Sequence, residues 1–116
     1  YTLTVVSNGF AECQNYKLAQ SGLLPYFKHI VLSEEVGIQK PNPLIFQDAI
    51  AMNRVEIPDL QPSEVIMIGD SYTSDIAGAK AAGIDSLWVL SGDATDEQRQ
   101  DATYIVPHLR DVMTIL

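Results

Sequence analysis

Short apolar runs alternate along this chain with longer segments in which apolar and polar residues mix. Four of the runs are typical of buried strands, because each is four or five residues long, mostly apolar and followed by Ser, Asn or Gly. The strands are expected at Leu3–Val6, His29–Leu32, Val65–Ile68 and Ser86–Leu90.

The mixed segments predict four helices, over about Glu12–Gln20, Pro43–Asn53, Ser74–Ala82 and Pro107–Leu116. Gly22 and Gly83 suit the left-handed ends of the first and third helices, and Asn42 suits the start of the second. Loops are expected over Ser33–Lys40 and Arg54–Ser63, and the acidic stretch Asp93–Asp101 is expected to be a solvated face or a loop. The aromatic residues expected in the core are Tyr26, Phe27, Phe46 and Trp88. Strands that alternate with helices predict an α/β fold with a doubly wound parallel sheet.

Composition and charge narrow the class of protein. The 116 residues suffice for one domain, and the net charge of −8 argues against binding to nucleic acid or to an anionic membrane surface. No apolar run reaches the length of a membrane span. The single cysteine, Cys13, cannot form an internal disulfide, which favours a reducing compartment, and we expect a cytoplasmic protein.

Two carboxylates follow the third predicted strand. Gly69 allows the chain to turn where the strand ends, and Asp70 then lies at the carboxyl edge of the sheet, where open α/β folds bind ligands. Asp75 follows five residues later, in the first turn of the predicted helix. Mg²⁺ prefers one or two carboxylates together with waters and a substrate phosphate. The sequence therefore predicts a magnesium site at Asp70, with Asp75 acting through water or a neighbouring group.

Polar groups also follow the first two predicted strands. Ser7, Asn8 and Gly9 offer a hydroxyl and backbone amides to an anion. Lys40 adds a positive charge on a flexible stem, which suits a phosphate. Because the carboxyl ends of parallel strands share one edge, these loops are expected to stabilise a phosphoryl group together with Asp70.

Each of these residues also has an interpretation without chemistry. Ser7–Gly9 suits an ordinary turn, Lys40 a solvated surface lysine, and Asp75 a helix cap. Gly69–Asp70 also suits a turn after a strand. The order of three motifs along one chain favours the chemical interpretation over coincidence.

With these motifs in this order, the chain resembles the haloacid dehalogenase (HAD) superfamily of hydrolases. The resemblance rests on Ser7-Asn8-Gly9, Lys40-Pro41 and Gly69-Asp70-Ser71 with Asp75, and on the runs at 33–37 and 75–83. It extends over nearly the whole chain. The runs at 7–10 and 33–37 are similar to those of family members that cleave nucleoside 5′-monophosphates.

The resemblance implies a Mg²⁺-dependent phosphomonoester hydrolase that acts on nucleotides or another small phosphorylated metabolite. An aspartate attacks phosphorus, and water hydrolyses the aspartyl phosphate with help from a second aspartate two residues on. Lys40 and Asp70 are the implied catalytic residues. The implied phosphate-binding residues are Ser7, Asn8, Gly9 and Lys40, and the implied metal-binding residues are Asp70 and, less directly, Asp75.

The aspartate pair that carries the nucleophile in this family has no counterpart here, because no two aspartates stand two residues apart. In the family that pair follows a central strand, which lies between the strands predicted at Leu3–Val6 and Val65–Ile68. We therefore expect residues 1–116 to be the C-terminal portion of a single HAD-like, Rossmann-like core domain without its first central strand, nucleophile and cap. This segment alone is expected to be inactive, and a missing N-terminal segment or a partner chain is expected to complete the sheet.

Two other functions fit the same motifs. A dehalogenase of this superfamily uses the aspartate nucleophile without a metal, and Asp70 directly after Gly69 favours the phosphatase over it. A phosphate- or metal-binding module without catalysis is the third interpretation, and it predicts binding without turnover.

Overall fold

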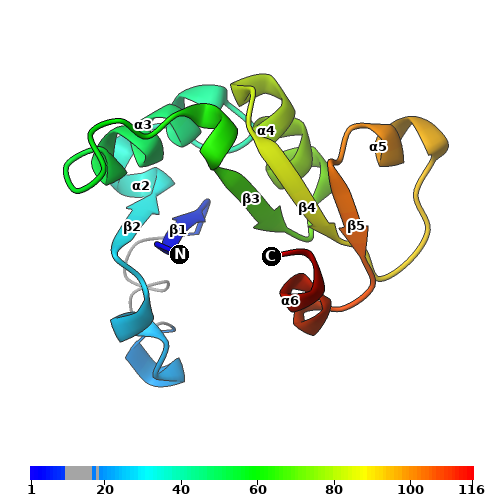
Figure 1. Ribbon diagram of the computed structural model, residues 1–116, viewed down its shortest axis with the longest axis horizontal. Helices are drawn as coiled ribbons and strands as arrows, with labels where there is room; N and C mark the ends of the chain where they lie inside the picture. The colour runs from blue at the N-terminus through cyan, green and yellow to red at the C-terminus, as the bar shows by residue number, and fades with distance from the viewer. Residues whose placement is uncertain (10–16, 18) are drawn as a thin grey trace. The chain divides into compact units, whose positions relative to one another are not determined.

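The computed structural model describes residues 1–9, 17 and 19–116, which form two compact units, residues 1–60 and 61–116 (Figure 1). Each unit has a parallel sheet of its own, with helices between its strands. The expected α/β class with parallel strands is therefore confirmed. Cys13 and most of the helix expected at Glu12–Gln20 lie outside the described residues. That residues 1–116 are part of one domain stays a prediction.

The first unit is built on two parallel strands. Its described elements are β1 (Thr4–Ser7), the short 3-10 helix η1 (Leu24–Tyr26), β2 (His29–Leu32), α2 (Ser33–Val36) and α3 (Pro43–Asn53). Thr4 lies opposite His29, and Ser7 lies opposite Leu32. Both strands therefore end at the same edge, where the polar residues that follow them are close together.

Helix α3 starts where the sequence predicts and packs on both strands of this unit. The Asn42 side chain accepts a hydrogen bond from the Leu44 backbone N–H at 3.0 Å, which is the bond expected of a helix cap. At the other end, the Asn53 side chain donates to the Ala49 carbonyl at 2.8 Å and to the Thr4 hydroxyl at 2.9 Å. The second bond fixes α3 to β1. The buried apolar side chains of this unit are Val31, Leu32, Ile45, Phe46, Ala49 and Ile50.

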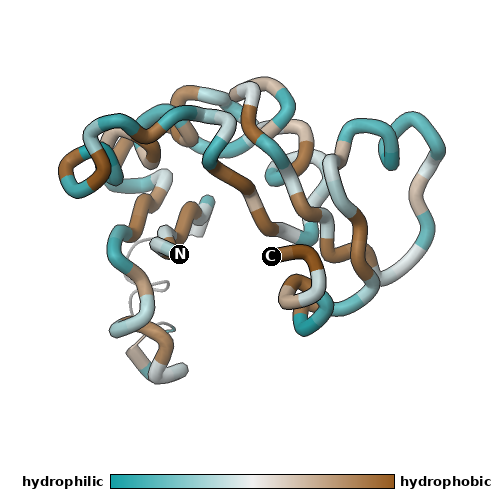
Figure 2. The backbone as a smooth tube through the Cα atoms, in the orientation of Figure 1, coloured by the Kyte–Doolittle hydropathy of each residue, from teal (hydrophilic) through white to brown (hydrophobic). Residues whose placement is uncertain are grey.

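The second unit is built on three parallel strands in the order β3, β4, β5. Its elements are η2 (Pro62–Glu64), β3 (Ile66–Gly69), the π-helix η3 (Tyr72–Ile76), α4 (Ala77–Ala82), β4 (Asp85–Val89), α5 (Asp96–Gln100), β5 (Tyr104–Val106), η4 (Leu109–Asp111) and α6 (Val112–Ile115). Figure 2 shows the hydrophobic stretches of β3 and β4 that supply part of its core. Leu87, Val106 and Val112 are buried there.

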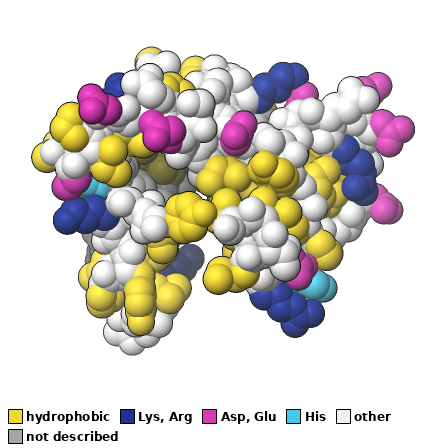
Figure 3. Space-filling model, in the orientation of Figure 1, with side chains coloured by type: hydrophobic (Ala, Val, Ile, Leu, Met, Phe, Trp, Pro, Cys, Tyr) yellow, Lys and Arg dark blue, Asp and Glu magenta, His cyan; other side chains and the backbone are white. Residues whose placement is uncertain are grey.

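Strands β1 and β3 each have one described neighbour, and no ladder joins them within the described part of the chain. All residues of both strands are half-buried. Each of these strands therefore has one edge that no described strand covers, and the expectation of a missing central strand stays a prediction. Figure 3 shows hydrophobic side chains at the visible surface, and the exposed ones of the second unit include Tyr104, Leu109, Met113 and Leu116.

Several expected elements differ from those observed. The loop expected over Ser33–Lys40 is wrong for its first four residues, which form α2 and end at Gly37 with φ of 74°. The acidic stretch 93–101 contains α5, which has no buried residue, so its interpretation as a solvated face holds and its interpretation as a loop does not. Thr95 and Gln98 cap this helix reciprocally. Strand β5 was not predicted, and only Val112–Ile115 of the expected closing helix is α-helical.

The aromatic residues divide between the core and the surface. Phe46 and Trp88 are buried, as predicted. Tyr26 is 70% exposed, so its prediction as a core residue is wrong. It lies in the short η1 turn, which has no buried residue. Within the described residues, every helix is too short or too polar to cross a membrane.

Candidate functional site

The loop after β1 is closed by a hydrogen bond between the Ser7 side chain and the Gly9 main chain. Ser7 is the last residue of the strand, and its hydroxyl oxygen accepts a hydrogen bond from the Gly9 backbone N–H at 3.1 Å. Because this bond uses the hydroxyl as an acceptor, the hydroxyl proton can still be donated to a ligand. Ser7 can therefore offer a hydrogen bond to a phosphoryl oxygen at the carboxyl end of β1.

Asn8 holds the loop that contains Lys40. The Lys40 backbone N–H donates to Asn8 Oδ1 at 2.8 Å, and Asn8 Nδ2 donates to the Lys40 carbonyl at 3.0 Å. Both main-chain groups of Lys40 are thus paired with one side chain, and the Lys40–Pro41 peptide bond that follows is cis. Asn8 therefore holds the Lys40 main chain beside the Ser7–Gly9 turn. Direct phosphate binding by Asn8 stays a prediction.

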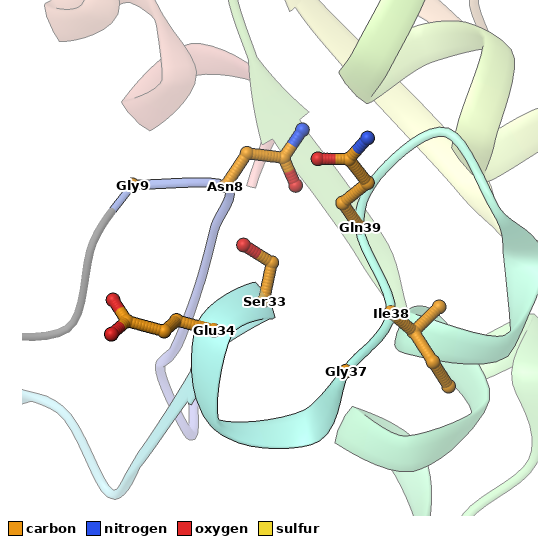
Figure 4. Close-up of a pocket in the computed structure, with 7 residues that line it drawn as sticks. All are labelled: Asn8, Gly9, Ser33, Glu34, Gly37, Ile38 and Gln39. Carbon is orange, nitrogen blue, oxygen red and sulfur yellow. The ribbon is translucent and has the colours of Figure 1, made fainter.

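A pocket of about 550 Å³ opens beside this turn in the first unit. Its walls come from the loop after β1, from α2 and from the segment before Lys40, and they are formed by Asn8, Gly9, Ser33, Glu34, Gly37, Ile38 and Gln39. In Figure 4 the amide groups of Asn8 and Gln39 extend to the same side of the pocket, whereas the Glu34 carboxylate points away from it. A pocket of this size suits a small metabolite.

In the second unit, Asp70 and Asp75 lie at the carboxyl end of β3. Asp70 follows the strand directly and is exposed. Asp75 is only 5% exposed, and its Oδ2 accepts a hydrogen bond from the Ser71 backbone N–H at 3.2 Å. The Ser71 side chain caps the helix by accepting from the Ser74 N–H at 3.4 Å. Ser71, rather than Asp75, is thus the cap of this helix.

A π-helical turn brings the Asp75 carboxylate back towards the strand. The Ser71 carbonyl accepts hydrogen bonds from the N–H groups of both Asp75, at 2.9 Å, and Ile76, at 3.2 Å. The widened turn covers Tyr72–Ile76, where the sequence predicts an α-helix that begins near Ser74. Such turns are rare and are frequently found at functional sites.

Gly69 makes room for this arrangement. A Cβ atom at this position would overlap the Asp75 carboxylate and would lie 2.6 Å from the Asp75 Cβ. Asp75 can therefore occupy this position only because residue 69 has no side chain. This requirement is separate from the backbone freedom that glycine gives to a turn.

The donor set can be compared with what Mg²⁺ requires. Within the described chain, no three His, Cys, Asp or Glu side chains gather into a metal site. Mg²⁺ does not need three, because it retains waters and uses one or two carboxylates with a substrate phosphate. One exposed carboxylate and a second that is held against the same strand end fit this requirement, so Asp70 and Asp75 are the residues that would hold the ion.

We predict that Gly69→Ala displaces the Asp75 carboxylate and destabilises the protein. Inserting a methyl group into a filled space costs about 1–3 kcal/mol of unfolding free energy. Urea unfolding of the full-length protein measures this loss. Gly92→Ala is the matched control, because a Cβ at Gly92 would meet no atom within 4 Å. Equal stability of the two variants would contradict the assigned role of Gly69.

A hydrogen-bonded group of side chains adjoins the Asp70 loop. The Tyr72 hydroxyl donates to Asp101 Oδ2 at 2.5 Å, and Lys80 Nζ donates to Asp101 Oδ1 at 2.5 Å. The Lys80 bond, followed by the Tyr72 bond, lowers the pKa of Asp101. The bond to Asp101 raises the pKa of Tyr72 and that of Lys80. These shifts widen the pH range in which the Asp101 carboxylate is ionised while the Tyr72 phenol and the Lys80 ammonium are protonated.

The structure brings the predicted residues together in two groups. Ser7, Asn8, Gly9 and Lys40 are close in the first unit, and Asp70 and Asp75 are close in the second. Action of both groups on one phosphoryl group stays a prediction. The sequence did not predict the pairing of Asn8 with Lys40 or the hydrogen bonds of Tyr72 and Lys80 to Asp101. The two residues of each pair are 21 to 32 residues apart, so they leave no local pattern in the sequence.

Parallel strands that alternate with helices in each unit, with polar loops after the strands, define a Rossmann-type α/β protein. A family model described as HAD-hydrolase-like matches residues 37–112. The chain therefore belongs to the HAD-hydrolase-like family, as the resemblance of its motifs indicated.

Known members are similar over the full length of the chain. The pyrimidine 5′-nucleotidase PynA of Streptococcus pneumoniae is 36% identical over 116 residues, which are 100% of this chain and 47% of that protein. A glyceraldehyde 3-phosphate phosphatase of Pyrococcus furiosus is 30% identical over 119 aligned positions, which span 100% of this chain and 48% of that protein. The chain thus spans about half the length of these relatives.

A solved structure shares the fold. The HAD-hydrolase YfnB of Bacillus subtilis, determined bound to magnesium, superposes with a TM-score of 0.82 at 34% sequence identity. The match covers 100% of this chain and 48% of the YfnB chain. The doubly wound, Rossmann-like expectation is confirmed for the part of the core that the chain covers.

Proposed function

We propose that the full-length protein to which this chain belongs is a Mg²⁺-dependent phosphomonoester hydrolase that works through an aspartyl phosphate. The nucleophilic aspartate is supplied from outside residues 1–116. The observation that carries the proposal is the Asp70–Asp75 pair at the end of β3, one carboxylate exposed and the other buried and hydrogen-bonded.

In this proposal the chain contributes binding and charge stabilisation. The Ser7 hydroxyl donates a hydrogen bond to a phosphoryl oxygen, and the Gly9 N–H fixes that hydroxyl by donating to its oxygen. The Lys40 ammonium offsets the negative charge that develops on these oxygens in the transition state. Asp70 and Asp75 would hold Mg²⁺, which would supply positive charge at the phosphate. Asn8 holds the Lys40 backbone beside the Ser7–Gly9 turn through two hydrogen bonds to the Lys40 main chain.

The proposed substrate is a nucleoside 5′-monophosphate or another small phosphorylated metabolite. Two observations support this class. The relatives named above hydrolyse phosphate esters by name, one of them pyrimidine nucleotides. The pocket beside the Ser7–Gly9 turn is of metabolite size and has polar groups in its walls. The net charge of −8 leaves phosphate recognition to local groups such as Lys40.

Phosphate release by the full-length protein tests this proposal. The substrate panel is a pyrimidine nucleoside 5′-monophosphate, glyceraldehyde 3-phosphate and a 2-haloacid, each assayed with Mg²⁺. We expect phosphate release from at least one ester and no halide release. Halide release would instead support the dehalogenase, and phosphate binding without turnover of any ester would support a binding module.

A further inference from the structure

Four side chains, from η3, α4, β4 and the segment after α5, surround the Asp70 loop. These side chains are Tyr72, Lys80, Trp88 and Asp101, which we call the loop clamp. They lie in the second unit and are linked to one another and to Asp70 by contacts of side chains far apart in the sequence.

Trp88 binds the main chain of Asp70 itself. Its indole Nε1 donates to the Asp70 carbonyl at 3.1 Å. Trp88 is only 3% exposed and lies opposite Gly69 in the β3–β4 ladder, so its ring is fixed by the sheet. This hydrogen bond sets the direction in which the chain leaves β3 at the proposed metal ligand.

Tyr72 holds the other side of the loop. Its ring packs on Trp88, with centroids 5.5 Å apart and planes inclined by 37°, and its hydroxyl donates to Asp101. Tyr72 is the first residue of the π-helix that carries Asp75. The Tyr72 ring and hydroxyl therefore fix the start of the turn that brings Asp75 back to the strand end.

Asp101 and Lys80 complete the clamp. Lys80 is in α4, which continues directly from the π-helix, and its ammonium binds the second oxygen of Asp101. The Asp101 side chain is 18% exposed, whereas that of Lys80 is 64% exposed. One carboxylate thus receives a hydrogen bond from the start of the π-helix and another from the helix that follows it.

We infer that the loop clamp positions Asp70 and Asp75 for Mg²⁺, with Tyr72 and Asp101 as the positioning residues. The inference rests on the proposed function, because it concerns the metal of that reaction. Groups that orient metal ligands without touching the metal typically change affinity or activity by about 10- to 100-fold when they are replaced. Loosening the clamp should therefore weaken Mg²⁺ binding and leave the chemical step of the loaded enzyme intact.

The test is calorimetric titration of Mg²⁺ into the full-length protein without substrate. For Tyr72→Phe and Asp101→Asn we expect the Kd for Mg²⁺ to rise about ten-fold, because each removes one link between the π-helix and Asp101. At saturating Mg²⁺, kcat should stay within about two-fold of wild type, because excess ion restores occupancy. The double variant should bind no more weakly than Asp101→Asn alone, because that change already removes the carboxylate to which Tyr72 donates.

Tyr104→Phe is the matched control. Tyr104 is 43% exposed, and its hydroxyl makes no hydrogen bond to the described residues, so its removal should leave the Kd for Mg²⁺ unchanged. Urea unfolding of each variant separates loss of fold from loss of metal affinity. Should Asp101→Asn fail to fold, Tyr72→Phe decides alone, since it removes one oxygen atom and keeps the ring on Trp88.

The outcomes separate this inference from the proposed function. If wild-type protein binds Mg²⁺ and the Tyr72→Phe and Asp101→Asn variants bind it as tightly as Tyr104→Phe, the positioning role of the loop clamp is contradicted. The proposed hydrolase function is not contradicted by that result. Wild-type protein that binds no Mg²⁺ would overturn both. A lower unfolding free energy at an unchanged Kd for Mg²⁺ would show a structural role only and would also overturn the inference.

Discussion

Asp70→Asn in the full-length protein is expected to lower Mg²⁺-dependent phosphate release by about 10³-fold or more. The neutral amide is a poor ligand for a hard cation, which selects charged oxygen donors. The fold should be unaffected, because Asp70 is exposed and its hydrogen bond to Trp88 uses the main-chain carbonyl, which the substitution keeps. The loss should therefore lie in catalysis and metal binding alone.

Glu97→Gln is the control for the loss of one negative charge. Glu97 is exposed in the first turn of α5, away from the end of β3 in the chain, and its replacement should leave kcat/KM within about two-fold of wild type. Steady-state kinetics across a Mg²⁺ series, with circular dichroism of each variant, compare the two. Asp70→Asn with activity within a few-fold of wild type would remove Asp70 from the metal site.

Lys40→Ala is expected to lower kcat/KM by about 10²-fold or more, because it removes the positive charge that offsets developing phosphoryl charge. Asn8 holds the backbone of Lys40, not its side chain, so the substitution can keep both hydrogen bonds of the loop. The effect should accordingly appear in catalysis with the Ser7–Gly9 turn still in place.

Lys28→Ala is the matched control in the same unit. Lys28 is exposed and precedes β2, so it lies at the opposite end of the strand from Ser33 and Lys40. Its removal should change kcat/KM by less than about two-fold. If Lys40→Ala changes kcat/KM no more than Lys28→Ala does, Lys40 is a solvated lysine without a catalytic role.

The sequence predicts the strands of this fold better than its short helices. Each of the four expected strands is present, because a short apolar run between turn residues has few alternatives to a buried strand. α2 and α5 contain four and five residues and no buried residue, so they leave no apolar period in the sequence. β5 was missed for a similar reason: it has three residues, and two of them, Tyr104 and Ile105, are exposed.

The candidate site could be predicted where its residues are local and not where they depend on distant partners. Ser7–Gly9 and Gly69–Asp75 are continuous in the sequence, so a strand end followed by polar residues indicates them. The π-helical form of Tyr72–Ile76 was not foreseen, because it depends on room at Gly69 and on the contacts of Tyr72 with Trp88 and Asp101. The tether from Asn8 to Lys40 likewise exists only once the chain is folded.

The most direct test of the hydrolase account is phosphate release by the full-length protein before and after chelation of divalent ions. The account predicts that a chelator reduces turnover of a phosphomonoester to background and that added Mg²⁺ restores it. Turnover that is unaffected by the chelator would contradict the account, because Asp70 and Asp75 would then hold no ion that the reaction needs.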